Sequence, residues 1–220
     1  MAGIITLAGD TDDVRWIKIS YTSWADCREG NTGSLGLDNL SFNGTGVQAY
    51  KANVRGVGLI WTITRSFYMF DTSFITHVPK LALLSIKGIT NGSCDIAVLK
   101  GSWNYLVGGL PDYGAIEGWG DGAPGDNINN VTHYADQVST WSTSGYNNIS
   151  LNQQALVDIA GEGQLQIALI SWDNDLRDVE PGTNIVNASG VYYTDNTGTA
   201  SDPRVKLTLQ DDAVFMGANF

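Results

Sequence analysis

Residues 59–70 place the strongest constraint on the fold of this chain. From Leu59 to Met69 every second side chain is apolar except Arg65, whereas threonine and serine occupy most of the positions between them. A period of two is that of a β-strand, in which successive side chains point to opposite faces of the sheet. The run therefore predicts one long strand with an apolar face and a more polar face.

Further strand signals recur along the chain, and one helix signal stands among them. Alternating or continuously apolar runs predict strands at residues 14–20, 81–89, 96–99, 165–172, 191–194 and 205–209. A helix is expected at residues 150–161, because Ser150 and Gln153 have the spacing of a capping box and Gly161 can end the helix in the left-handed conformation. Residues 101–150 are rich in glycine and asparagine, and we expect strands joined by large ordered loops there.

The composition favours strands and turns over charged helices. Charged residues make up 16% of the chain, below the usual value of about 25%, and 26 glycines supply turns. Many strands with a single helix indicate an antiparallel sandwich. The predicted fold is all-β: an antiparallel β-sandwich of the jelly-roll type, with one short α-helix and long ordered loops.

We divide the chain into a central domain and two terminal segments. Residues 14–210 form the predicted jelly-roll domain, residues 1–13 an N-terminal segment that could serve as a docking arm, and residues 211–220 an apolar tail. An apolar terminus left in water favours aggregation. The tail is therefore expected either to fold back onto the domain or to mediate assembly, through Val214, Phe215, Met216 and Phe220.

The net charge of −11 argues against several classes of partner. An acidic chain repels phosphate backbones, so nucleic-acid binding is not expected. No apolar run is long enough to cross a bilayer, so membrane insertion is not expected either. The N-terminus has neither a basic region nor a long apolar stretch, and we expect synthesis in the cytoplasm without a signal peptide.

Two segments of the chain carry a resemblance to a known family. Residues 64–75 read Thr-Arg-Ser-Phe-Tyr-Met-Phe-Asp-Thr-Ser-Phe-Ile and precede an apolar strand at residues 81–86. Residues 191–193 (Val-Tyr-Tyr) lead through residues 202–204 (Asp-Pro-Arg) to the alternating run at 205–209. These segments resemble the signature of DNRLRE-type jelly-roll domains, which are similar to carbohydrate-binding modules and have relatives in phage virion proteins. The resemblance implies a sandwich fold and a role in a virion or in sugar binding.

The first of these segments also has a physical interpretation. A guanidinium among apolar neighbours requires a carboxylate, and Asp71 is one candidate partner for Arg65. Asp71 also begins an Asp-Thr-Ser sequence that favours a turn through bonds to nearby backbone amides. We therefore expect the signature residues to determine the fold rather than to act in catalysis: Arg65, Phe67, Phe70 and Asp71.

Catalytic motifs are missing from the sequence. The two histidines, His77 and His133, lie outside any HExxH motif, no serine lies in GxSxG, and no phosphate-binding glycine loop occurs. A pair of glycosidase carboxylates could be drawn from the many aspartates, but spacing favours no particular pair. We expect a protein that is not an enzyme.

Calcium is the one ion that the sequence suggests, and no other cofactor is expected. Asp173, Asp175 and Asp178 place hard oxygen ligands close together, as calcium requires. Their spacing is not that of an EF-hand, so solvated turn aspartates are the alternative. Cys27 and Cys94 are too few for a disulfide framework and could be two buried thiols or one bridge.

Four tryptophans lie in glycine-rich, loop-like sequence: Trp24, Trp103, Trp119 and Trp141. An exposed aromatic platform would stack on the faces of sugars, which predicts a surface for binding glycans. The alternative is that large ordered loops need buried aromatic anchors of their own.

These features lead to three hypotheses for the function. The first is a non-enzymatic structural protein of a phage virion: a head fibre or capsid-decorating subunit, or a tail adsorption protein. It would be made in the host cytoplasm, lie on the virion surface, and form a homo-oligomer, with a trimer as the guess, in contact with other virion proteins. The alternative is a carbohydrate-binding module that binds surface glycans, and the second alternative is a glycan-cleaving enzyme.

Overall fold

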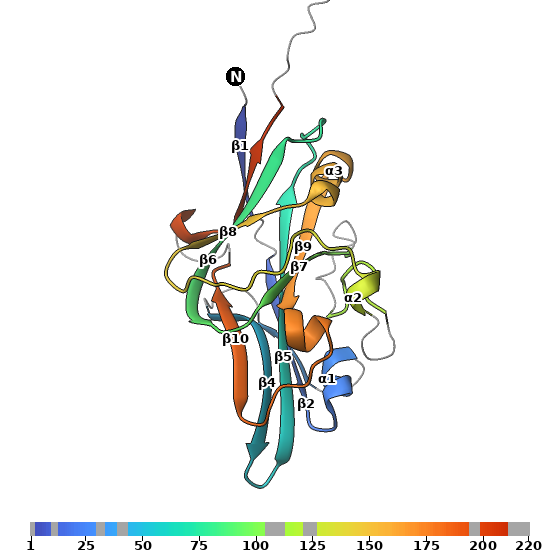
Figure 1. Cartoon of the computed structure of the whole chain (residues 1–220), viewed down its shortest axis with the longest axis vertical. Coiled ribbons are helices and arrows are strands. Elements are labelled where there is room, and N and C mark those ends of the chain that lie inside the picture. Colours follow the sequence, from blue (N-terminus) through green and yellow to red (C-terminus); the bar gives the residue numbers. More distant parts are fainter. Residues whose placement is uncertain are drawn as a thin grey trace, which may run out of the picture.

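Strands are the main element of the computed structural model, which describes residues 3–9, 13–29, 34–38, 44–103, 113–120, 127–193 and 199–210 (Figure 1). The strands are β1 (Ile4–Ala8), β2 (Val14–Ser20), β3 (Ser34–Asp38), β4 (Gly44–Val54), β5 (Gly58–Asp71), β6 (Leu81–Gly92), β7 (Ile96–Lys100), β8 (Tyr146–Ser150), β9 (Gln164–Ser171), β10 (Ile185–Val191) and β11 (Arg204–Thr208). The helices are α1 (Trp24–Glu29), α2 (Asn127–Asn130) and α3 (Gln153–Gly161), with a π-helical turn η2 (Trp172–Leu176) and a 3-10 turn η3 (Thr199–Ser201).

The strands form two layers that share one core. The first layer has the order β1-β11-β6-β8. The second layer is centred on β5, with β2 and β3 on one side and β4, β9 and β7 on the other. Strand β10 pairs with both β4 and the end of β6, so it links the two layers. All these pairings are antiparallel, which confirms the predicted all-β, jelly-roll-like sandwich.

Strand β5 is buried on both faces from Trp61 to Phe70 except at the half-buried Thr62, although the sequence predicted only one apolar face for this strand. Tyr68 and Phe70 point into the main core between the layers. Ile63 and Phe67, on the opposite face, belong to two further apolar clusters, which include residues of α1 and η2. Ser66, expected on the polar face, is also buried, and its hydroxyl group contacts a backbone carbonyl of β4. The most regular strand of the fold is therefore enclosed on both sides.

Helix α3 confirms the predicted helix but not its cap. The N-cap is Asn152, whose side chain accepts a hydrogen bond from the Ala155 N–H at 3.1 Å. Ser150 is not available as a cap because it is the last residue of β8 and pairs with β6. At the other end Gly161 is still helical, and Gly163 takes the positive φ of 73°. None of the helices in the described ranges is long and apolar enough to span a membrane.

The two ends of the described chain lie together at one end of the molecule (Figure 1). Strand β1 pairs with β11 along its length, and the Leu209 N–H donates to the Gly3 carbonyl at 2.9 Å. Residues 4–8, expected in a separate N-terminal segment, are thus a strand of the sandwich, and Leu7 is buried in its core. The hairpin between β4 and β5 forms the opposite end. The tail residues predicted to mediate assembly lie outside the described residues: Val214, Phe215, Met216 and Phe220.

Candidate functional site

A buried arginine organises the outer face of the second layer. Arg65 on β5 has no exposed surface, and its Nε and Nη2 atoms each donate to one carboxylate oxygen of Asp175 at 2.7 Å. Nη1 donates to the Tyr113 carbonyl at 2.6 Å, and Nη2 also donates to the Arg28 carbonyl at 2.9 Å. The Cζ atom lies 3.9 Å from the ring centre of Tyr113 and 4.2 Å from that of Trp119. One side chain thus joins β5, α1, η2 and the segment 113–119.

Arg65 keeps its charge despite its burial. Burial acts to lower the pKa of Arg65, but the negative charge of Asp175 and its hydrogen bonds outweigh burial and raise that pKa. Bidentate bonds between a guanidinium and a carboxylate are among the strongest in proteins. Removing either partner would leave the other as an unpaired buried charge, which is strongly destabilising.

Asp71 is not the partner of Arg65, so that prediction is wrong. Residues 65 and 71 are about 20 Å apart along an extended strand, which is too far for an ion pair. The exposed Asp71 carboxylate accepts a hydrogen bond from the Ser73 N–H at 2.9 Å, and the bonds to Ser73 lower its pKa. Asp71 therefore stabilises the turn after β5. Phe67 and Phe70 are fully buried on opposite faces of β5, as fold determinants should be.

The three aspartates predicted as calcium ligands are engaged separately. Asp175 binds the buried arginine, Asp173 forms an ion pair with Arg177 at 3.3 Å, and Asp178 accepts a hydrogen bond from the Trp24 indole at 2.9 Å. Across the ranges that the structure describes, no three His, Cys, Asp or Glu side chains form a group that could hold a metal ion. These carboxylates thus do not converge as a ligand set, because arginine and indole groups take their oxygens.

Two further cations, which the sequence did not single out, flank this network. The fully buried Lys18 ammonium lies 5.8 Å from the centre of the Tyr113 ring and has no hydrogen-bond partner among the described residues. Burial lowers the pKa of Lys18. Arg28 donates from Nε to the Asp175 carbonyl at 2.6 Å and lies 3.6 Å from the Asp178 carboxylate. A lysine in an alternating strand normally faces water, so only the packing of α1 over β2 reveals its burial.

The four tryptophans predicted as a sugar platform are divided among three apolar clusters. Trp24 begins α1 and Trp141 lies in the main core, with 8% and 9% of their surfaces exposed. Their indole N–H groups donate to Asp178 and to the Gly190 carbonyl, each at 2.9 Å. Both side chains therefore anchor irregular or short segments to the sheet, which is the alternative given above.

The other two tryptophans lie together on the outer face of the second layer. Trp103 and Trp119 are half-buried against the cluster that contains Phe67, and the rings of Trp103 and Phe67 meet edge to face at 5.7 Å. Trp16 and Trp172, which the sequence analysis did not select, pack against the same cluster. Their indoles cover the outer face of the sheet.

Three carboxylates gather around Lys100 at the end of β7. Its Nζ lies 3.0 Å from Glu117, 3.2 Å from Asp158 and 2.7 Å from Glu162. Burial acts to lower the pKa of Lys100, but hydrogen bonds to these carboxylates outweigh it and raise the pKa. The group ties α3 to β7 and to the segment around Glu117, and the shared lysine balances part of its negative charge.

The outer face of the first layer is largely exposed or half-buried, and its charged side chains are basic. Strand register places on it every second residue of four strands: Ile4, Thr6, Ala8, Leu81, Leu83, Ser85, Lys87, Tyr146, Asn148, Ser150, Arg204, Lys206 and Thr208. None of these residues is acidic, although the chain has 23 acidic and 12 basic residues. Ile4 and Leu81 lie on either side of Thr208, and 62% and 61% of their surfaces are exposed. A shallow groove of about 360 Å³ passes beside Arg204 and Lys206.

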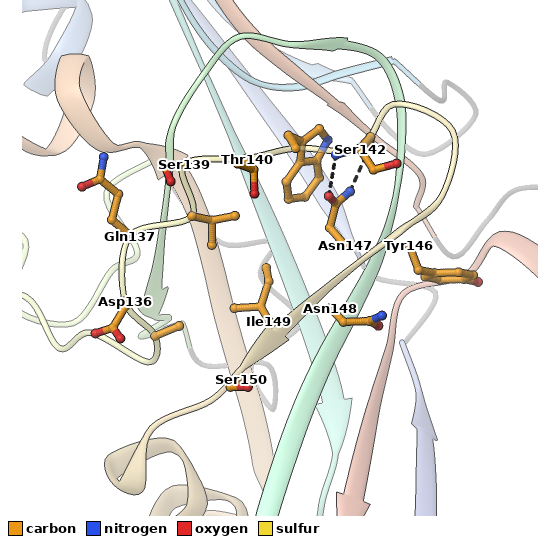
Figure 2. Close-up of a pocket in the computed structure, with 13 residues that line it drawn as sticks. Asp136, Gln137, Ser139, Thr140, Ser142, Tyr146, Asn147, Asn148, Ile149 and Ser150 are labelled. Carbon is orange, nitrogen blue, oxygen red and sulfur yellow. Dashed lines mark hydrogen bonds between the residues drawn. The ribbon is translucent and has the colours of Figure 1, made fainter.

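A larger hollow, of about 620 Å³, lies between β8 and residues 135–142 (Figure 2). Its lining includes four apolar side chains that also belong to the main core or pack against it: Ala135, Val138, Trp141 and Ile149. Its remaining lining is mainly polar and includes exposed side chains: Asp136, Gln137, Ser139, Thr140, Ser142, Asn148 and Ser150. The hollow therefore combines an apolar floor with a polar rim.

Comparisons with known proteins identify no family for the chain, so its function has to be inferred from the geometry. No protein-family model matches the chain, and no curated protein matches it. The resemblance to DNRLRE-type domains therefore stays a prediction from the residues that carry it.

Proposed function

We propose that the chain is a non-enzymatic structural subunit of a phage virion, as a head fibre or capsid-decorating protein. It attaches to the shell of the particle through the outer face of its first layer. The observation that carries the proposal is the composition of that face, which combines exposed apolar and basic side chains and contains no acidic residue.

The apolar part of the face has the character of an interface centre. Ile4 and Leu81, on either side of Thr208, expose more than half of their surfaces, and Leu83 lies half-buried on the same face of β6 as Leu81. Burying apolar surface in a contact contributes about 25 cal/mol for each Å² removed from water. The guanidinium of Arg204 stacks on the Tyr146 ring at 4.1 Å, which gives the basic part of the face a flat surface. Arginine and tyrosine are enriched in protein interfaces.

The charge of the face indicates an acidic protein surface as its partner. Lys87, Arg204 and Lys206 lie on the face, so the rest of the chain holds nine basic residues (12 − 3) against 23 acidic ones. A face of positive charge on an otherwise negative molecule orients it toward an acidic partner and turns its own acidic surface away. Nucleic acid does not fit, because the remaining surface repels a polyanion.

The use of polar groups supports a role without catalysis. Among the described residues, the Lys100 ammonium holds the carboxylates of Glu117, Asp158 and Glu162. The guanidinium of Arg65 holds the buried carboxylate of Asp175. These ionic groups hold elements of the fold together. A general acid or base needs a proton that substrate can reach.

The test is attachment to purified particles of the source phage. Wild-type protein should co-sediment with the particles, and the variant Arg204→Glu/Lys206→Glu should lose at least tenfold in affinity. Arg55→Glu, an exposed charge reversal beside the β4–β5 hairpin at the other end of the molecule, is the matched control and should bind like wild type. Equal binding of the double variant, or absence of the protein from the particles, would contradict the proposal. Turnover of a polysaccharide, or binding to it that sugars displace, would favour the two alternatives instead.

A further inference from the structure

Strand β8 has an open edge at which a further strand could pair. Among the strands of the described ranges, β8 pairs with β6 alone. At its two ends the Gly88 N–H donates to the Gly145 carbonyl at 2.9 Å and the Leu151 N–H to the Ala82 carbonyl at 3.0 Å. Because hydrogen-bonded pairs alternate in an antiparallel ladder, the odd-numbered residues of β8 face β6 with their backbone groups. The backbone N–H and C=O groups of the even-numbered residues point away from the sheet.

This edge carries none of the usual protection. The strand reads Tyr-Asn-Asn-Ile-Ser, with no lysine, no proline and no charge. Edge strands in stable monomers are commonly protected by such residues, because free backbone groups pair with other chains. The outward groups at Asn148 and Ser150 instead border the hollow of Figure 2.

The hollow has the size of one short strand. A residue in a sheet occupies about 160 Å³, from a rise of about 3.4 Å, a strand spacing of about 4.8 Å and a layer thickness of about 10 Å. The hollow of about 620 Å³ therefore has room for about four residues. One hydrogen bond joins the two sides of the hollow near each end: the Asn152 N–H donates to the Tyr134 carbonyl at 2.8 Å, and the Ser142 N–H donates to the Asn147 side chain at 2.7 Å.

We propose that β8 binds the C-terminal segment of a second copy of this chain as an added antiparallel strand. This proposal rests on the assembly role proposed above. Residues 213–220 read Ala-Val-Phe-Met-Gly-Ala-Asn-Phe and carry no charged side chain. In an added strand, alternate side chains lie over the apolar floor formed by Val138, Trp141 and Ile149, and the others face the polar rim. The backbone of the segment satisfies the free groups of β8.

Within one copy, residues 211–216 would be used to span the distance from Gln210 to the hollow, which leaves residues 217–220 to enter it. The last described residue, Gln210, lies two positions beyond Thr208, which is level with Leu81, whereas Ser150 is level with Leu83. The path to the hollow crosses three strand spacings and four residues along the strands, about 19 Å in all. That distance takes about six extended residues, so the apolar residues Val214 to Met216 are used up before they reach the hollow. Only a neighbouring copy can place the apolar run Val214 to Met216 over the floor of the hollow, so we assign the site to the segment of a neighbour.

The experiment compares self-association in the full chain and in a chain that ends at Gln210. Sedimentation equilibrium should give an oligomer for the full chain and a monomer for the truncated one. A labelled peptide of residues 211–220 should bind the truncated chain. Asn148→Pro removes an outward N–H and keeps the backbone bonds to β6, and it should weaken peptide binding at least tenfold and abolish self-association. It also loses the hydrogen bond that the Asn148 side chain accepts from the Ser85 hydroxyl at 2.6 Å, a bond that Asn148→Thr loses as well. Asn148→Thr keeps the N–H and should behave like wild type.

Amide hydrogen exchange supplies a readout that does not depend on the proline variant folding. The amides of Asn148 and Ser150 should exchange slowly in the full-length oligomer and at least tenfold faster after truncation. Equal mass of the two chains would overturn the proposal. So would a full-length monomer in which the tail still protects these amides, because the segment would then bind its own copy. If the truncated chain no longer self-associates but still attaches to particles, strand addition is supported. If Arg204→Glu/Lys206→Glu still self-associates but no longer attaches, the failure of one proposal can be told from the failure of the other.

Discussion

Replacing Asp175 with asparagine is the sharpest test of how the outer face of the second layer is held together. Arg65 and Asp175 have no exposed surface, and two bonds of 2.7 Å join them. Each hydrogen bond to a charged group contributes about 1.5–3 kcal/mol, and breaking a buried pair costs about 3–5 kcal/mol. For a chain of 220 residues, a loss of that size lowers Tm by about 10 °C. Urea unfolding followed by tryptophan fluorescence measures the free energy directly.

Two comparisons decide whether the pair itself is responsible. Asp71→Asn, at the partner that the sequence suggested, should change the free energy of unfolding by less than about 0.5 kcal/mol, because that carboxylate is exposed. The double variant Arg65→Met/Asp175→Leu should lose less than the sum of the single variants, because no unpaired charge remains. Equal effects at positions 71 and 175, or additive single variants, would refute the reasoning.

Three further predictions concern a lysine, two glycines and the cysteines. Lys18→Met should stabilise the fold by about 1–3 kcal/mol at pH 7, because an unpartnered ammonium leaves the interior. Burial lowers the folded-state pKa of Lys18 below the ordinary 10.5, so the unfolded chain binds more protons as the pH approaches 10.5. The free energy of unfolding of the wild type should therefore rise relative to that of Lys18→Met between pH 7 and pH 9.5. An equal difference between the two proteins in urea unfolding at both pH values would contradict this. Gly88→Ala should cost about 2 kcal/mol, since its Cβ would lie 1.8 Å from the Ser142 carbonyl, whereas Gly161→Ala, with no atom within 4 Å, should gain up to about 1 kcal/mol in thermal melts. Cys27 and Cys94 are free and buried, and burial raises the pKa of each thiol to about 12. Both thiols should therefore resist alkylation at pH 8 in the folded protein. After unfolding, mass spectrometry should show both alkylated without any reductant, because no disulfide has to be broken.

The sequence predicted what depends on local periodicity. The alternation through residues 59–70 predicted β5, and the runs at 81–89 and 205–209 predicted β6 and β11. The helix at 150–161 was also predicted, but its cap was placed at Ser150 because the sequence does not reveal that β8 continues to that residue. The short helix α1 has too little periodicity to be predicted.

The candidate sites depend on contacts that periodicity does not encode. Arg65 was correctly expected to need a carboxylate, but Asp175 is far away in the sequence, and only the fold brings η2 over β5. The tryptophans were selected by their glycine-rich neighbours, and Trp24 and Trp141 are nevertheless buried. The outer face of the first layer became visible only from the register of four strands, because its basic residues come from separate parts of the chain.

The first and last described residues lie close to each other, and this has a practical consequence. Since the Leu209 N–H donates to the Gly3 carbonyl, an anchor joined to the chain at Gly3 or at Leu209 holds the same pole of the molecule. The β4–β5 hairpin at the other pole then faces outward, with Val57 at its tip 59% exposed (Figure 1). A peptide inserted at this hairpin would therefore be displayed away from the anchor.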